Sequence, residues 1–571
     1  MRKLRLVIGI AAALTVVQPA SQAFAAYTIV TDSIYKHIAV LSSDSLEGRE
    51  VGEPGERKAA RYIIDEFKSA GLQPRGDSGQ YLQAFEFIKR ISFGSKNQLA
   101  INGKNLKLND DYIPLEQSAS LPFNFSQVVS VGYGIKTEDS SVNDYSGKDV
   151  AGKAVLIERF SPKADSSSHV DLTKYESITD KIMTALDHKV AGIFFVTPSD
   201  LDDSIRVGVV VHVTPKSIPI IFLKQAGLAK LGIKPEAPSL ASAVGETELI
   251  PVQDTGYNVV GYLPGKSDST IIIGAHYDHL GYGGPASRYT GKERLIHHGA
   301  DDNASGSAGL MELARYFSTR RDSLDHSLLF IAFSGEEAGL LGSGWYVRHW
   351  SVDSSKVRMM INMDMIGRLK DQEHGLQIFG IGTATEFKNY FDSLQADSLK
   401  LSFREPGTGP SDHTSFYNCQ IPVLHFFTGA HEDYHKPSDV IEKIDFKGTV
   451  RVVNLVAGVA NHFDRYPHNL TFQRTKDSGE GKQRASFSVT LGVMPDYGAQ
   501  VKGLRVDGVS PDKPAERAGI KKGDIIVKMG PVVIDDIYAY MSALGKFHKG
   551  DSTNVLVLRG ADTLSLPVVF K

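Results

Sequence analysis

Acidic and histidine side chains collect where apolar runs of this sequence end. The runs read "TIIIGAH", "SLLFIAF", "VRMMINM" and "IPVLHFF", and each is long enough for a buried strand. The residues at or after their ends are His276, Asp278, Glu336, Glu337, Asp364, His431, Asp433 and His435. The loop "GADDNASG" adds Asp301 and Asp302 before a predicted helix. Because the carboxyl ends of parallel strands form one crevice, we expect these side chains to meet there.

Adjacent glutamates at the end of a buried strand repel each other unless something compensates their charge. Divalent cations would do so, and imidazole nitrogen with carboxylate oxygen suits zinc, with cobalt or manganese as alternatives. One glutamate of the pair could bind metal while the other takes a proton from water. For Glu336 and Glu337 alone, acids decorating a helix N-terminus explain the pattern equally well. The whole set of residues favours metal.

The segment "HEDYH", residues 431–435, matches the helical zinc motif H-E-x-x-H. That motif needs a helix with both histidines on one face. Here Gly429 precedes the segment and Pro437 follows it, so the residue before the proline is biased away from helical geometry. We therefore predict a loop after a strand and not a zincin helix.

Six segments, in this order along the chain, resemble the motifs of the M28 family of co-catalytic zinc aminopeptidases. They are "GAHYDHLG", "GADDNASG", "SGEEAGLLGS", "NMDMIGR", "SDHTSF" and "YHKPSD". The segment "LSSDSLEGREVGEPGERKAARYI" is similar to the N-terminal part of bacterial members. The region that follows it resembles a protease-associated (PA) domain. The C-terminal region, with "SPDKPAERAGIKKGDIIVKM", resembles a PDZ domain, and "LGVMPDY" is its candidate carboxylate-binding loop.

The resemblance implies two zinc ions per chain and a ligand set for each. His276 and Asp364 would bind one ion, Glu337 and His435 would bind the other, and Asp302 would bridge the two.

The resemblance also implies roles for residues that do not bind metal. Glu336 would be the general base and then the general acid toward the leaving amine. Asp278 would hydrogen-bond the far nitrogen of the first histidine ligand. Asp412 and His413 would line the substrate pocket. Asp301 lies one residue off the family pattern, so we assign it to the scaffold.

Alternating strands and helices position these residues. The near-continuous apolar runs predict an α/β fold, a mixed, mostly parallel sheet flanked by helices, which the resemblance specifies as the zinc exopeptidase fold. A β-rich PA-type insert and a small β-rich PDZ-type C-terminal domain complete the chain. The predicted boundaries are 1–25 signal peptide, 26–110 and 251–466 peptidase domain, 111–250 insert, 467–484 linker and 485–571 PDZ-type domain.

The N-terminus and the composition limit where the protein works. A basic start, an apolar stretch and Ala23-Phe24-Ala25 form a signal-peptide pattern, so we predict a periplasmic or secreted protein with no membrane anchor after cleavage. A formal net charge of -3 gives no reason to expect nucleic acid as a partner. The lone cysteine, Cys419, cannot form an internal disulfide, and its apolar surroundings predict a core position.

The predicted function is that of an exported zinc aminopeptidase that removes N-terminal residues from peptides. A carboxypeptidase of the same fold is the alternative enzyme, and its substrate carboxylate would need an arginine. Candidates near motifs are Arg288, Arg294, Arg368 and Arg404. A third hypothesis is a non-catalytic protein that captures peptides through its PA and PDZ domains. The PDZ-type domain is expected either to take a peptide C-terminus by strand addition or to dock on the catalytic crevice.

Overall fold

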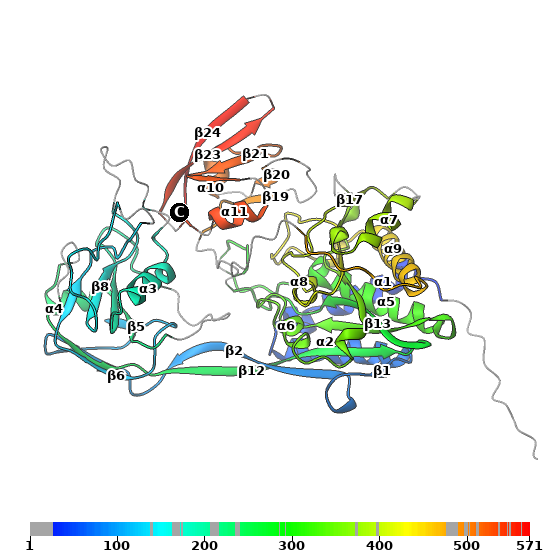
Figure 1. Cartoon of the computed structure of the whole chain (residues 1–571), viewed down its shortest axis with the longest axis horizontal. Coiled ribbons are helices and arrows are strands. Elements are labelled where there is room, and N and C mark those ends of the chain that lie inside the picture. Colours follow the sequence, from blue (N-terminus) through cyan, green and yellow to red (C-terminus); the bar gives the residue numbers. More distant parts are fainter. Residues whose placement is uncertain are drawn as a thin grey trace, which may run out of the picture.

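The computed structural model shows a large mixed α/β domain, a β-rich insert and a C-terminal β domain (Figure 1). It describes residues 27–570 except for short segments. Those segments are 138–140, 163–171, 173–174, 206–215, 235–239, 285, 292, 372–374, 395–398, 476–488, 496–500, 502, 510–512, 535–536, 545, 548–549 and 561. The predicted signal peptide, half of the predicted linker (residues 476–484) and the end of "LGVMPDY" therefore lie outside the described residues.

The main sheet confirms the predicted mixed topology. Its order, with β2 paired to β12 at one side, is β1-β12-β14-β13-β15-β18-β16-β17, and the central strands β14, β13, β15 and β18 are parallel. The bounds of these strands are β1 Gln73–Pro74, β2 Leu82–Phe93, β12 Leu249–Leu263, β13 Ser267–His276, β14 His326–Phe333, β15 Val357–Met363, β16 Leu376–Phe379, β17 Leu401–Phe403 and β18 Val423–Phe427. The four apolar runs singled out in the sequence are these central strands.

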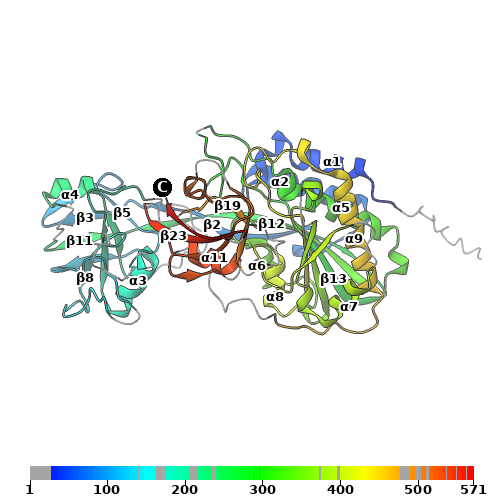
Figure 2. The same ribbon diagram turned by 90° about the horizontal axis from the view of Figure 1, so that it is seen from above.

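Helices cover both faces of this sheet, which explains why its strands are apolar throughout (Figure 2). Alternate residues of β13 separate onto the two sides, so that Ile271 and Ile273 belong to one buried cluster and Ile272 to another. Helices α1, α2, α5 and α9 pack on the first side, and α6 and α8 on the second. The helix bounds are α1 Thr31–Leu41, α2 Pro54–Ser69, α5 Gly306–Ser318, α6 Leu341–Tyr346, α7 Thr385–Ser393, α8 His413–Asn418 and α9 Phe446–Asp464.

The insert is joined to the main sheet by the long ribbon of β2 and β12 (Figure 1). Its two sheets run β5-β10-β9-β8-β7 and β4-β3-β11-β6, and two strands that precede the predicted boundary at residue 110, β3 and β4, pair inside it. The bounds are β3 Gln98–Ile101, β4 Lys104–Leu106, β5 Tyr112–Pro114, β6 Pro122–Phe125, β7 Val128–Ser130, β8 Ala154–Glu158, α3 Ile178–Asp187, β9 Gly192–Val196, β10 Ile220–Leu223, α4 Gln225–Leu231 and β11 Ala243–Glu246.

The C-terminal domain is an antiparallel sheet of order β19-β20-β21-β23-β24 with its own buried core. Its elements are β19 Val493–Pro495, β20 Leu504–Val509, α10 Pro514–Arg517, β21 Ile525–Met529, β22 Val532–Val533, α11 Ile537–Leu544, β23 Ser552–Arg559 and β24 Asp562–Val569. In the part of the chain that is described, no helix has the length and apolar character needed to cross a membrane.

The prediction that Cys419 lies in the core is wrong. The residue follows the last turn of α8, where its backbone N–H caps the helix, and its side chain is exposed. The apolar strand begins only at Val423, so the apolar surroundings in the sequence belong to the strand and not to the turn before it.

Candidate metal centre

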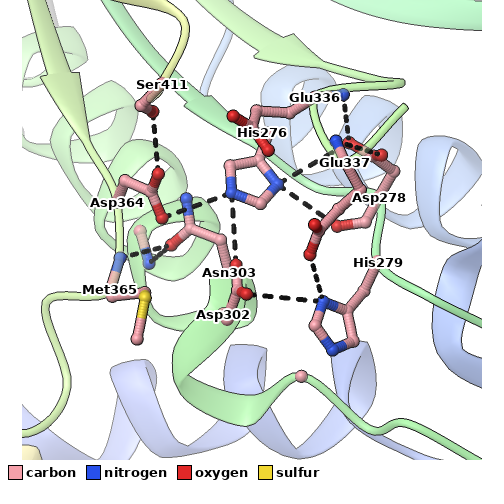
Figure 3. A network of polar contacts seen from close by, with 12 residues as sticks. His276, Asp278, His279, Asp302, Asn303, Glu336, Glu337, Asp364, Met365 and Ser411 are labelled. Atoms are coloured by element: carbon pink, nitrogen blue, oxygen red, sulfur yellow. Dashed lines mark hydrogen bonds and ion pairs between the residues drawn. The ribbon is translucent and has the colours of Figure 1, made fainter. Parts of the chain in front are cut away.

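The first candidate ligand group lies where β13 and β15 end. His276 is the last residue of β13, and its Nε2 lies 3.3 Å from Asp302 Oδ1 and 3.2 Å from Asp364 Oδ1 (Figure 3). Asp364 directly follows β15, the neighbour of β13. All three side chains are buried, and one ligand atom from each lies within 4.8 Å of the others, so they could hold one ion.

The second group surrounds Glu337, which lies four residues after the end of β14. His435 Nε2 lies 3.0 Å from Glu337 Oε2 and 3.3 Å from Asp302 Oδ2. His279 approaches the same carboxylates, with Nδ1 2.8 Å from Glu337 Oε1. One ligand atom each from His279, Asp302 and Glu337 also lies within 4.8 Å of the others, so these three residues could hold a second ion.

Asp302 joins the two groups because each of its oxygens faces one of them. Oδ1 faces His276, and Oδ2 faces His435 and His279. Neither Asp302 Oδ2 nor His435 Nε2 has a well-oriented hydrogen-bond partner within the described part of the chain, although both are buried. Buried polar atoms without partners are costly, and cations between these groups would satisfy them. The donor set of imidazole and carboxylate therefore fits a pair of zinc ions.

Asp278 fixes Glu336 and Glu337 relative to His276. Its Oδ1 accepts a hydrogen bond from the backbone N–H of Glu336 at 3.1 Å, and its Oδ2 lies 3.4 Å from the backbone nitrogen of Glu337. The far nitrogen of His276, Nδ1, lies 3.2 Å from the backbone oxygen of Asp278 and 3.6 Å from its carboxylate. The residue thus links the end of β13 to the two glutamates after β14.

Asp301 lies outside both ligand groups. Its Oδ1 accepts a hydrogen bond from Gly367 N at 2.6 Å, and its Oδ2 lies 3.2 Å from His431 Nε2. Asp439 accepts hydrogen bonds from the backbone N–H groups of Asp301 and Asp302 at 3.0 and 3.1 Å. These contacts hold the π-helical turn Ala300–Ser305, which leads into α5.

The two histidines of "HEDYH" face different partners in a turn. His431 contacts Asp301, whereas His435 contacts Glu337 and has a left-handed backbone with φ 58°. The segment is not helical, so it cannot place both histidines on one helix face.

Arg49 ties the N-terminal segment to the loops that carry the ligands. It is fully buried, and its guanidinium donates hydrogen bonds to the backbone oxygens of Leu41, Tyr277, His298 and Gly299. Burial lowers the pKa of Arg49 to about 10, although nearby acids, Asp278 first, oppose that shift. The residue therefore places a buried positive charge near the carboxylates of the site, Asp278 and Asp302 among them.

The charges of the two ligand groups stabilise one another. Burial alone would lower the pKa of His276, but the carboxylates of Asp364, Asp278 and Asp302 raise it well above the usual value. Burial would likewise raise the pKa of Glu337, but the imidazoles of His435 and His279 bring it down to about 2. At neutral pH Glu337 is therefore an anion, the form that binds metal.

Comparison with known proteins gives the large domain a family. The sequence profile of peptidase family M28 matches residues 258–460, which hold every ligand described above. Residues 258–460 of this chain therefore form a domain of peptidase family M28. A PDZ domain profile matches residues 489–569, which form the C-terminal sheet.

Curated relatives agree with this M28 assignment. A "Probable leucine aminopeptidase" of Trichophyton verrucosum is 31% identical over 214 residues, covering 35% of this chain and 55% of the relative. "Aminopeptidase YwaD" of Bacillus subtilis is 29% identical over 429 residues, covering 72% of this chain and 80% of the relative. The chain thus spans little more than half the length of the fungal relative, and most of the length of the bacterial one.

A solved structure, "Aminopeptidase from Aneurinibacillus sp. strain AM-1", aligns at 24% identity and a TM-score of 0.46. The alignment covers 78% of this chain and 97% of that one.

Asp412 and His413 lie at the start of α8 in the M28 domain, and both are fully buried. Burial raises the pKa of the Asp412 carboxyl to about 7, and burial lowers that of His413 well below its usual value. The ring of His413 stacks on His425 with centroids 4.3 Å apart. Their part in substrate binding stays a prediction.

Four residues of the M28 site were missed by sequence reasoning. Ser411 donates a hydrogen bond to Asp364 Oδ2 at 2.7 Å, and His279, Arg49 and Asp439 make the contacts given above. His279 and Asp439 stand inside segments already singled out, "GAHYDHLG" and "YHKPSD". Considering every histidine and carboxylate in those segments would have found them. Arg49 also stands in a segment already singled out, "LSSDSLEGREVGEPGERKAARYI", but its residue type and neighbours do not tell it from an exposed arginine.

Proposed function

We propose that this protein is an exported dinuclear zinc aminopeptidase that hydrolyses the first peptide bond of peptides. The observation that carries the proposal is the pair of ligand groups that share Asp302, with Glu336 placed beside Glu337. The printed names of the relatives, aminopeptidases of fungi and of Bacillus subtilis, support the same reaction for this chain.

The chain's own residues divide the work of hydrolysis. His276 and Asp364 would hold one zinc ion and Glu337 and His435 the other, with Asp302 between them. Zinc, when bound, polarises a carbonyl oxygen and lowers the pKa of water. Glu336 takes a proton from the attacking water and passes it to the nitrogen of the leaving amine as the C–N bond breaks.

Asp278 and the fold keep this base in position. Glu336 follows a buried strand, and its backbone N–H is held by a carboxylate that also neighbours His276. A general base must stay within hydrogen-bond reach of the proton that it removes, so this anchoring supports catalysis without direct contact with substrate.

The remaining domains suit a protein that handles peptides outside the cytoplasm. The signal-peptide pattern supports export, to the periplasm or the medium. We assign the insert as a PA-type domain from its resemblance and its two small sheets, and the PDZ domain as a site for a peptide C-terminus. No nucleic acid or membrane anchor is part of the proposal.

A carboxypeptidase is the second candidate, because one arginine contacts the loop of a candidate ligand. Arg368 is already engaged by Asp433 at 2.8 Å and by the backbone oxygen of Lys443. The backbone N–H of Arg288, however, donates to His435 O at 2.9 Å, so its backbone lies beside the loop of His435, and its guanidinium lies 5.9 Å from the centroid of the Tyr434 ring. A substrate carboxylate held there would reverse the direction of the peptide in the site.

The variant Glu336→Gln tests the proposed base. We expect it to keep both zinc ions and to lose turnover of an aminoacyl 4-nitroanilide by about 100- to 10,000-fold, the usual contribution of a general base. Zinc content by elemental analysis and the rate of nitroaniline release are the two measurements. The exposed neighbour of His431 provides a matched control, Glu432→Gln, which should keep normal turnover. Near-normal turnover in Glu336→Gln would remove that residue from the role.

A further inference from the structure

His279 is placed like a metal ligand although no family motif assigned it that role. It lies three residues beyond His276, and its side chain is completely buried. Its Nδ1 lies 2.8 Å from Glu337 Oε1 and 3.7 Å from Asp302 Oδ2, and Figure 3 shows the ring turned toward both carboxylates. Its backbone N–H is held by Arg49 O at 3.3 Å, which fixes the loop on which it stands.

His435 reaches the same point from a different loop. The two imidazole centroids are 6.0 Å apart, and the rings use different oxygens of Glu337. They share Asp302 Oδ2, which His435 Nε2 approaches to 3.3 Å. One terminal carboxylate, one bridging carboxylate and both imidazoles therefore face a single position.

We propose that His279 Nδ1 is an additional protein ligand at the Glu337 and His435 position, an inference that rests on the proposed dinuclear centre. This position would then offer two imidazoles, while the position at Asp364 offers His276 alone. Nitrogen-rich sites favour zinc, cobalt and nickel over manganese and magnesium, whereas carboxylate-rich sites discriminate less. The two positions would consequently differ in affinity, and the one with His279 would fill first.

A hydrogen bond is the competing role for His279. In that role Nδ1–H donates to Glu337 Oε1 and only orients the carboxylate. The two roles differ in what can replace the imidazole, because a glutamine amide can donate a hydrogen bond but is a poor ligand for zinc or cobalt. A histidine nearby gives a control: His297 is buried in the adjacent loop, and its ring nitrogens contact Ser287 Oγ at 2.7 Å and Leu295 O at 3.2 Å.

The test is a titration of the full-length, metal-free protein with Co²⁺, followed by visible absorption and by bound metal per chain. We expect wild type to bind two equivalents in two steps, and His297→Gln to match it. His279→Ala and His279→Gln should both weaken the tighter step by at least about tenfold, the smallest loss usual for a partner of a metal site. The cobalt absorption of that step should change, because the coordination changes.

Three outcomes would overturn the inference. An unchanged two-step titration in His279→Ala would show that the imidazole binds no metal. A loss in His279→Ala that His279→Gln restores would assign the hydrogen-bonding role. A wild-type protein that takes up no cobalt would instead refute the dinuclear centre itself, so the two failures are distinct. Circular dichroism of both variants separates loss of a ligand from loss of the fold.

Discussion

Asp302 is the residue that the two candidate ligand groups share. Its two oxygens face different ligand groups, and its backbone N–H is held by Asp439. A bridging carboxylate also screens two cations from each other, because negative charge between them offsets their repulsion. Removing it should therefore affect both metal positions, whereas removing a terminal ligand should affect one.

Asp302→Ala should lose at least one zinc ion per chain after dialysis, together with turnover. The adjacent Asp301 offers a matched control: Asp301→Asn can still accept the hydrogen bond from Gly367 N, so it should retain two ions. Elemental analysis of the dialysed proteins makes the comparison. Two tightly held zinc ions in Asp302→Ala would refute the bridge.

At the scale of the elements, the loops that carry the candidate ligands depend on Arg49, which lies before the matched M28 region begins at residue 258. The variant Arg49→Met should lower the free energy of unfolding by about 3 kcal/mol, because methionine cannot donate the charged hydrogen bonds that Arg49 makes to several buried carbonyls. Arg57→Met, an exposed arginine of α2 with one hydrogen bond to Gly52 O, is the control and should cost less than about 0.5 kcal/mol. Urea unfolding measures the stability of both variants, and equal midpoints would show that the hydrogen bonds of Arg49 do not stabilise the fold.

Glu312 joins α5 to α1 and makes a prediction about pH. Its Oε2 accepts hydrogen bonds from Tyr27 and Ser33, both at 2.7 Å, and its Oε1 lies 3.1 Å from His37 Nε2. Burial would raise the pKa of Glu312, but the hydrogen bonds from His37, Ser33 and Tyr27 outweigh it and lower the pKa below 4.5. The folded state therefore binds this proton more weakly than the unfolded state, and the stabilisation is present above pH 4.5 and lost as the pH falls through the folded value.

Glu312→Gln should accordingly be less stable than wild type by about 1–3 kcal/mol at pH 7. The difference should shrink as the pH drops below 4.5. Unfolding curves at several pH values measure it, with Asp65→Asn, an exposed residue of α2, as control. A difference that stays constant from pH 7 to acid would contradict the assigned role of the carboxylate.

Strand ends could be predicted from the sequence, and contacts between distant segments could not. The apolar runs before His276 and Asp364 are long and unbroken, so the ends of β13 and β15 followed directly from them. The backbone hydrogen bonds of Arg49 depend on a loop some 250 positions away in the chain, which no local pattern encodes. The same limit explains why strands as early as Gln98–Ile101 belong to the insert, because they pair with β11 near residue 245.

The whole molecule combines the M28 domain with two β-rich domains, and the ribbon of β2 and β12 is the link to the insert (Figure 1). Lys89 lies on that ribbon, and its Nζ contacts Glu53 Oε1 at 2.6 Å and Asp254 Oδ2 at 2.8 Å. The ribbon is therefore fastened to the segment before α2 on the side of the M28 domain.

The most direct test of the account is mass spectrometry of matched peptides incubated with the zinc-loaded protein, one with a free N-terminus and one acetylated there. We predict stepwise loss of residues from the free N-terminus, with the acetylated peptide intact. Loss of residues from the C-terminus of both peptides would contradict the aminopeptidase and direct attention to Arg288. Cleavage of neither, by a protein shown to hold two zinc ions, would contradict the proposal that this centre is catalytic.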